Sequence, residues 1–128
     1  MTTELSMLLY TTLIFFALLA GNATYGTIRM GMGWAFGNRN EPADLGETGA
    51  RIKRTIENHK EGLLLFVPVV LIIAVAGLST PQTVLGAQIY FFCRLLHAAT
   101  YVMGIPYIRS ISWIAGIVAL AMMVVALF

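Results

Sequence analysis

The side chains best suited to chemistry form a polar stripe that runs straight into an apolar segment, RIKRTIENHKEGLLLF (residues 51–66). On a helix, positions i, i+3, i+7 and i+10 fall within an arc of about 80°. The residues at these positions are Arg51, Arg54, Asn58 and Glu61. Lys53 and Lys60 fall on the opposite side of the helix. Because arginine grips carboxylates bidentately, the stripe suits an anionic ligand; the alternative is a solvated helix end with snorkelling cations.

A second polar stripe lies inside a segment that is otherwise mostly apolar. Its members are spaced i, i+4, i+7 and i+11, within an arc of about 60°. They are Tyr90, Arg94, His97 and Tyr101. An arginine deep in a membrane span costs roughly 2.5–3.5 kcal/mol, so Arg94 must face the bundle interior and find a partner. Glu61 is the nearest acidic candidate, and a purely structural Arg94–Glu61 pair is one alternative to ligand binding.

The composition places both stripes in a membrane protein. Of 128 residues, 59% are hydrophobic and 11% are charged, whereas a soluble domain carries about 25% charged residues. The net charge of +2 is too small to indicate nucleic-acid binding. The single cysteine, Cys93, excludes an intramolecular disulfide, and no metal site is expected.

Four apolar segments are long enough to cross a bilayer, which takes about 20 residues. They span about 6–28, 48–78, 81–104 and 109–128, and Thr80-Pro81 is a typical start for the third. The short second and third connections make neighbouring helices antiparallel. The sequence therefore predicts one all-α domain, residues 1–128, built as an integral membrane four-helix bundle. The second helix, about 45 Å long, should project beyond the roughly 30 Å hydrocarbon layer.

The positions of the basic residues predict the orientation. Six of the eight lysines and arginines fall between Arg29 and Lys60, in and around the long first connection at 31–47. The third connection adds Arg109, and the second has none. By the positive-inside rule, the first and third connections face the cytoplasm and both termini lie outside. Trp34 and Trp113 then lie near the cytoplasmic interface. The expected location is a bacterial inner membrane.

Helix geometry brings the polar residues to one level of the membrane. Arg94 and His97 lie about 21 and 25 Å from the outer cap of their helix. The first helix carries Asn22, Tyr25 and Arg29 on one face, with Arg29 at its cytoplasmic end. The fourth should begin at Arg109-Ser110, where the helix N-terminus favours anions. Several arginines then face a single inward acid, Glu61, and this excess of positive charge predicts an anionic ligand.

These residues resemble a known family. The pattern R-x-x-R-x-x-x-N-x-x-E, from Arg51 to Glu61, and the segment RLLHAATYVMGIPYIRS, residues 94–110, are similar to the MAPEG family, the membrane-associated proteins of eicosanoid and glutathione metabolism. The family includes microsomal glutathione transferases, prostaglandin E synthase and leukotriene synthases. The resemblance implies a homotrimer of four-helix bundles, with glutathione bound between neighbouring subunits near the cytoplasmic face.

Carried over position by position, the resemblance assigns roles to individual residues. Arg109 would stabilise the glutathione thiolate, with Ser110 as an alternative donor. The glutathione-binding residues would be Arg29, Arg51, Arg54, Asn58, Glu61, Arg94, His97 and Tyr101. The sequence departs from the family pattern at Glu57, Gly62 and Trp113, where better-known members often carry an arginine, a larger residue and a tyrosine.

Two functions follow from these expectations. The first is a glutathione-dependent membrane transferase or peroxidase, in which an arginine-stabilised thiolate attacks hydrophobic electrophiles. Its partners would be glutathione as cosubstrate, lipophilic small molecules, membrane lipid and other copies of the chain, with no nucleic acid. The alternative is a non-catalytic membrane protein that binds anionic lipid in a basic pocket between helices. A transporter is less favoured, since the chain has no repeat or pair of broken helices.

Overall fold

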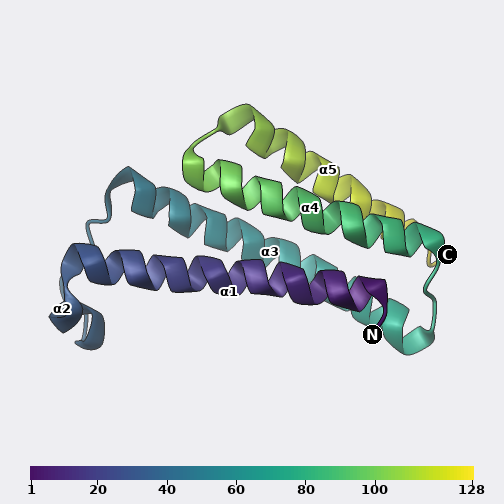
Figure 1. Cartoon of the computed structure of the whole chain (residues 1–128), viewed down its shortest axis with the longest axis horizontal. Coiled ribbons are helices and arrows are strands. Elements are labelled where there is room, and N and C mark those ends of the chain that lie inside the picture. Colours follow the sequence, from purple (N-terminus) through teal and green to yellow (C-terminus); the bar gives the residue numbers. More distant parts are fainter.

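The computed structural model describes residues 1–128, which fold into helices and connections without a strand. The helices are α1 (Thr3–Met30), α2 (Met32–Phe36), α3 (Gly46–Ala76), α4 (Pro81–Met103) and α5 (Pro106–Val125) (Figure 1). The all-α class is as predicted. The four long helices match the four expected segments, and the addition is α2, a five-residue helix within the first connection. It is separated from α1 by Gly31, whose φ of 87° suits glycine.

The charged stripe and the apolar segment that follows it belong to one uninterrupted helix. α3 runs for 31 residues from Gly46 to Ala76, as the sequence predicts for this region. Pro68 lies inside it, which membrane helices tolerate. The helix ends at Gly77 in the left-handed conformation, φ 66°, a common helix stop.

The end of the bundle opposite the long connection is closed by a buried carboxylate that the sequence did not single out. Glu4 is fully buried, and its Oε1 accepts hydrogen bonds from Ser79 (2.7 Å) and Thr83 (2.6 Å). Thr80 caps α4 and Pro81 opens it, as predicted. These contacts fix the start of α1 against the turn between α3 and α4 and the first turn of α4.

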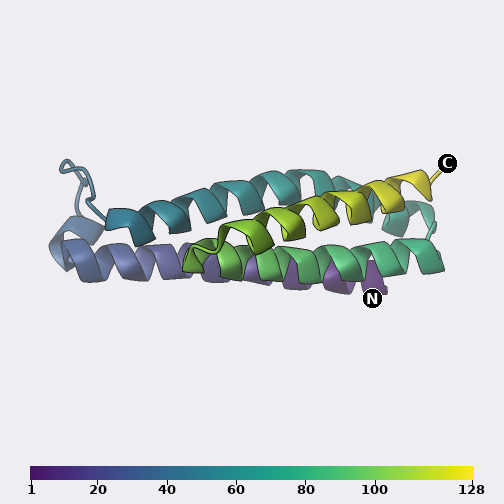
Figure 2. The ribbon, with the colours of Figure 1, turned by 90° about the horizontal axis from the view of Figure 1, so that it is seen from above.

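The four long helices lie side by side along the long axis of the molecule (Figures 1 and 2). Their buried apolar core comprises Phe66, Val70, Ile73, Ala87, Tyr90, Ala119, Leu120 and Met123. α4 and α5 approach closely at Gly86, where an added Cβ atom would collide with the side chain of Met123. The first turns of α3, with the end of α1 and with α2, extend beyond the α4–α5 turn (Figure 2). The start of the charged stripe on α3 therefore lies at the end of the bundle that carries the first connection.

Three of these helices, α1, α3 and α5, are long and apolar enough to cross a membrane. The chain is thus an integral membrane protein. The sequence predicted four spans, but α4, which carries the Arg94–His97 stripe, is not among the three.

Candidate functional site

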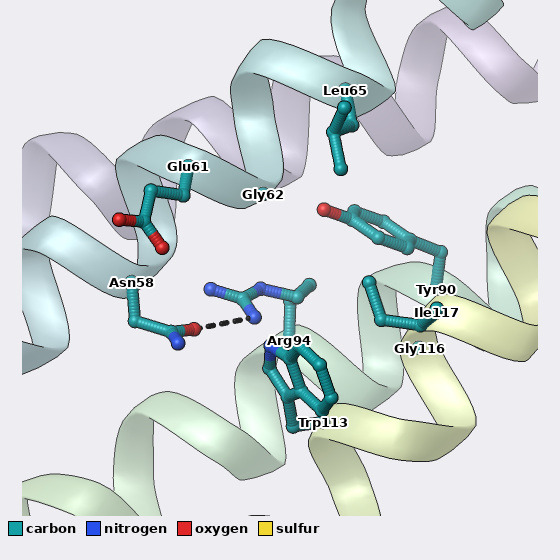
Figure 3. A pocket seen from close by; sticks show the side chains of 9 residues that line it. All are labelled: Asn58, Glu61, Gly62, Leu65, Tyr90, Arg94, Trp113, Gly116 and Ile117. Atoms are coloured by element: carbon teal, nitrogen blue, oxygen red, sulfur yellow. Dashed lines mark hydrogen bonds between the residues drawn. The ribbon is translucent and has the colours of Figure 1, made fainter.

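Three hollows meet at the side chain of Asn58, which lines all of them. The deep hollow, of about 100 Å³, is lined by Asn58, Glu61, Gly62, Leu65, Tyr90, Arg94, Trp113, Gly116 and Ile117 (Figure 3). The Arg109 hollow, of about 420 Å³, is lined by Asn58, His97, Tyr101, Arg109, Ser110, Trp113 and Ile114. The Arg54 hollow, of about 310 Å³, is lined by Lys53, Arg54, Glu57, Asn58, Glu61 and Tyr101. Residues of α3, α4 and α5 thus form one connected polar region.

Arg94 is the most deeply placed cation of this region, and only 3% of it is exposed. Its Nη1 donates a hydrogen bond to Asn58 Oδ1 at 3.0 Å (Figure 3). The sequence pointed to Glu61 as its partner, but no ion pair joins the two residues; the chain's side-chain ion pairs are Arg51–Glu47 and Lys60–Glu57. Nε and Nη2 of Arg94 are buried without any partner. A buried guanidinium without a counter-ion is unfavourable, so this position calls for an anion.

An aromatic side chain connects α4 with the start of α5. The ring of His97 packs edge-on against Tyr101, with 5.4 Å between ring centroids. On the same tyrosine ring lies the guanidinium carbon of Arg109, 4.7 Å from the centroid, a cation–π geometry. The three residues therefore form a continuous wall of the Arg109 hollow.

The fourth long helix begins earlier than the sequence suggested. It starts at Pro106, a residue favoured in the first turn, so Arg109 and Ser110 lie inside the helix rather than at its first position. Ser110 Oγ donates to the carbonyl oxygen of Pro106 at 3.1 Å. The hydroxyl proton is thereby engaged, which leaves Arg109 as the freer donor toward the hollow.

The α3 stripe contributes its exposed members to the Arg54 hollow. Arg54 and Glu61 are exposed, and Asn58 is half-buried. Lys60 pairs with Glu57 at 2.7 Å and lies outside the three hollows, as its side of the helix predicts. Lys53 was predicted on the opposite side, yet it lines the Arg54 hollow, because a long flexible side chain reaches beyond the arc of its Cα atom.

Two of the predicted binding residues lie outside the three hollows. Arg51 Nε donates to the carbonyl oxygen of Val102 at 3.2 Å, and its guanidinium lies beside Gly104, the residue that ends α4. Arg29 is exposed at the end of α1, next to Gly46 at the start of α3. Tyr25, on the same face of α1, donates to the carbonyl oxygen of Leu45 at 3.2 Å. Within one chain these contacts hold helix ends.

Two buried polar residues beside the site were given no role by the sequence reasoning. His59 is fully buried; its Nε2 lies 3.1 Å from the carbonyl oxygen of Thr11 and its ring stacks on Phe15. Tyr90 is 1% exposed, and its hydroxyl has no hydrogen-bond partner. In the sequence, Tyr90 could have been assigned to the site because it shares a helix face with Arg94. The only sequence feature that linked His59 to the site is that it follows Asn58.

A sequence profile of the MAPEG family matches residues 7–128, nearly the whole chain. The chain therefore belongs to the MAPEG family, and is a membrane protein related to glutathione and eicosanoid metabolism. No curated protein and no solved structure matches the chain.

Proposed function

We propose that the chain is a glutathione-dependent membrane transferase or peroxidase that acts on hydrophobic electrophiles. The observation that carries the proposal is the buried Arg94, which has no carboxylate partner, lines the deep hollow and donates a hydrogen bond to Asn58, the residue that all three hollows share. Membership of the MAPEG family makes glutathione the anionic ligand to consider first.

The donor set around Asn58 fits the charges of glutathione. The tripeptide has two carboxylates and one ammonium group. Arg54 and Arg94 are suited to the carboxylates and Glu61 to the ammonium, since charge-assisted hydrogen bonds of this kind are the strong ones. Asn58 would contribute amide hydrogen bonds between them, and His97 and Tyr101 would line the part of the site that faces α5.

Arg109 is the residue we assign to the thiol. A free thiol has a pKa of about 8.5, and a neighbouring arginine lowers it, so more of the bound glutathione is the nucleophilic thiolate. Attack on an electrophilic carbon forms a carbon–sulfur bond and expels the leaving group. Attack on a hydroperoxide releases an alcohol and leaves a sulfenic acid, which a second glutathione converts to a disulfide and water.

The hollows are open enough to take part in an interface with a second copy of the chain. Arg54, Glu61 and Trp113 are exposed in one chain, and we propose that the homotrimer covers them. The exposed Arg29 at the end of α1 is then the cation that a neighbouring chain can supply to the ligand. In this assembly α4 crosses the membrane with the other long helices, in a bacterial inner membrane, with the first and third connections cytoplasmic.

A second candidate is a non-catalytic protein that binds anionic lipid in the same region. The exposure of Lys53 and Arg54, on turns of α3 that we place at the lipid headgroups, favours it. Conjugation of glutathione to an activated aryl chloride by the detergent-purified protein separates the two candidates. The transferase proposal expects chloride release that exceeds the protein-free rate and increases with protein concentration. If the protein does not accelerate conjugation while anionic lipid still binds, the second candidate is the better account.

A further inference from the structure

The deep hollow contains buried donors that the glutathione assignment does not fully use. Three of the donor atoms on its wall have no hydrogen-bond partner: Arg94 Nε, Arg94 Nη2 and the Tyr90 hydroxyl. Buried polar groups are rarely left unpaired, because each costs about 1–3 kcal/mol. The unpaired donors of two residues on one small hollow indicate a ligand group that accepts hydrogen bonds.

The two free nitrogens of Arg94 are the pair that binds a planar anion side-on. Nη1 is taken by Asn58, which leaves Nε and Nη2, whose N–H bonds point the same way and match the two oxygens of a carboxylate. Both nitrogens are shielded at the wall of the hollow, so the guanidinium must turn toward the hollow to bind a carboxylate there. The hollow holds about 100 Å³, several times the roughly 10–15 Å³ that a cavity needs to hold one water, which leaves room for a carboxylate.

The charge balance favours a carboxylate over a phosphate. One guanidinium balances one negative charge, whereas a phosphate group carries about −1.5 to −2. Glu61 lines the same hollow and repels any anion there, a phosphate more strongly than a carboxylate because its charge is larger. Burial makes such an imbalance costly, because the interior screens charges poorly.

The absence of a side chain at Gly62 leaves the space of the deep hollow open. A Cβ atom at position 62 would lie 2.7 Å from the Tyr90 hydroxyl oxygen and 3.3 Å from Arg94 Cζ. Tyr90 cannot give way easily, since its ring stacks on Phe66 with 4.1 Å between centroids and both rings belong to the buried core. Figure 3 shows the hydroxyl directed toward α3 between Gly62 and Leu65.

We infer that the deep hollow is a carboxylate subsite in which the Tyr90 hydroxyl and the Nε–Nη2 edge of Arg94 bind the two oxygens, with Gly62 keeping it open. The carboxylate comes either from glutathione, in which case the inference rests on the proposed function, or from a membrane fatty acid. Tyr90 is then a binding residue, and Gly62 determines which ligands fit.

Calorimetric titration of the detergent-purified protein tests the subsite with four probes: glutathione, its diethyl ester, decanoate and decanol. Tyr90→Phe should weaken the acid that occupies the subsite roughly 10- to 150-fold. It should leave the matching ester or alcohol, which binds weakly already, unchanged. Tyr107→Phe, at a tyrosine that is 82% exposed, is the control and should change nothing.

Gly62→Ala provides the second variant and should also weaken the acid at least tenfold, while Gly21→Ala, which meets no atom within 4 Å, should not. If both acids bind Tyr90→Phe as tightly as wild type, or if neither binds the wild type, the subsite is overturned. If wild type binds glutathione and Tyr90→Phe changes neither glutathione nor decanoate affinity, the subsite is contradicted but the proposed function is not. If decanoate affinity depends on Tyr90 and glutathione does not bind at all, the subsite is supported and the proposed function is contradicted.

Discussion

The guanidinium of Arg109 lies 4.7 Å from the ring centroid of Tyr101, so the first turns of α5 meet the last turn of α4 across the short third connection. This contact holds a cation on the wall of the Arg109 hollow instead of leaving it free at the membrane surface. Tyr101 also lines the Arg54 hollow. A ligand held by Arg54 therefore lies next to the cation that we assign to its thiol.

Arg109→Ala should slow catalysis without much loss of glutathione affinity. An arginine beside the sulfur stabilises the thiolate more than the neutral thiol, and such interactions raise the rate rather than ground-state binding. The pKa of the bound thiol should rise toward about 8.5. The pH dependence of thiolate absorbance in the ultraviolet reads this out, and conjugation to a hydrophobic electrophile should fall in parallel.

A matched control for this variant is Arg39→Ala. Arg39 also lies over an aromatic ring, that of Trp34 at 4.9 Å, but in the first connection and outside the three hollows. It should leave thiol pKa and rate at wild-type values. If Arg109→Ala does the same, Arg109 is only a basic residue at the membrane surface.

Arg51→Ala should lower stability and leave glutathione affinity within about twofold. Its Nε donates to the carbonyl oxygen of Val102 near the end of α4, where a cation also complements the helix dipole. Loss of this hydrogen bond should cost about 1–2 kcal/mol, seen as a lower melting temperature in detergent. Lys60→Ala, which removes only an exposed ion pair, is the comparison. If Arg51→Ala has a normal melting temperature but binds glutathione much more weakly, Arg51 is a glutathione-binding residue and not a structural one.

The polar stripes were predictable from the sequence because helical periodicity alone determines which residues share a face. Arg94, His97 and Tyr101 do line connected hollows with Asn58 and Glu61. Their depth relative to α3 was not predictable to within one helical turn, about 5.4 Å. That single turn separates Asn58 from Glu61, and it decides which of them binds Arg94.

The other differences between the sequence-based prediction and the structure arise from the length of side chains and from short local elements. The projection that placed Lys53 opposite Arg54 follows Cα directions, whereas its ammonium lies at the end of four methylene groups. α2 has five residues, too few for a periodic pattern. Arg29 and Arg51 carry the right charge on the right faces, but their contacts with the start of α3 and the end of α4 depend on how the helix ends meet.

The first connection should be accessible only from the cytoplasm. Six basic residues lie between Arg29 and Lys60, and the positive-inside rule places such a segment inside. In a Cys93→Ala background, which removes the only cysteine, a single cysteine introduced by Asn40→Cys should react with an impermeant thiol reagent only after the cells are opened. Labelling of intact cells from outside would contradict this prediction and show that the topology is the reverse.

The purified protein should be a trimer. Arg54, Glu61 and Trp113 line the hollows yet are exposed in one chain, and a neighbouring copy would cover them. Native mass spectrometry in mild detergent should show three chains, with glutathione bound to the trimer. A stable monomer that binds glutathione with full affinity would contradict an interfacial site.

The most direct test of the central claim is calorimetric titration of wild type, Arg54→Ala, Glu61→Gln and Lys60→Ala with glutathione. The account predicts saturable binding to the wild type. It predicts a loss of roughly 10- to 150-fold for both Arg54→Ala and Glu61→Gln, since each removes a charged hydrogen bond of about 1.5–3 kcal/mol. Lys60→Ala, which lies outside the hollows, should bind as the wild type does. No binding to the wild type, or equal losses in all three variants, would contradict the claim that this stripe of α3 binds glutathione.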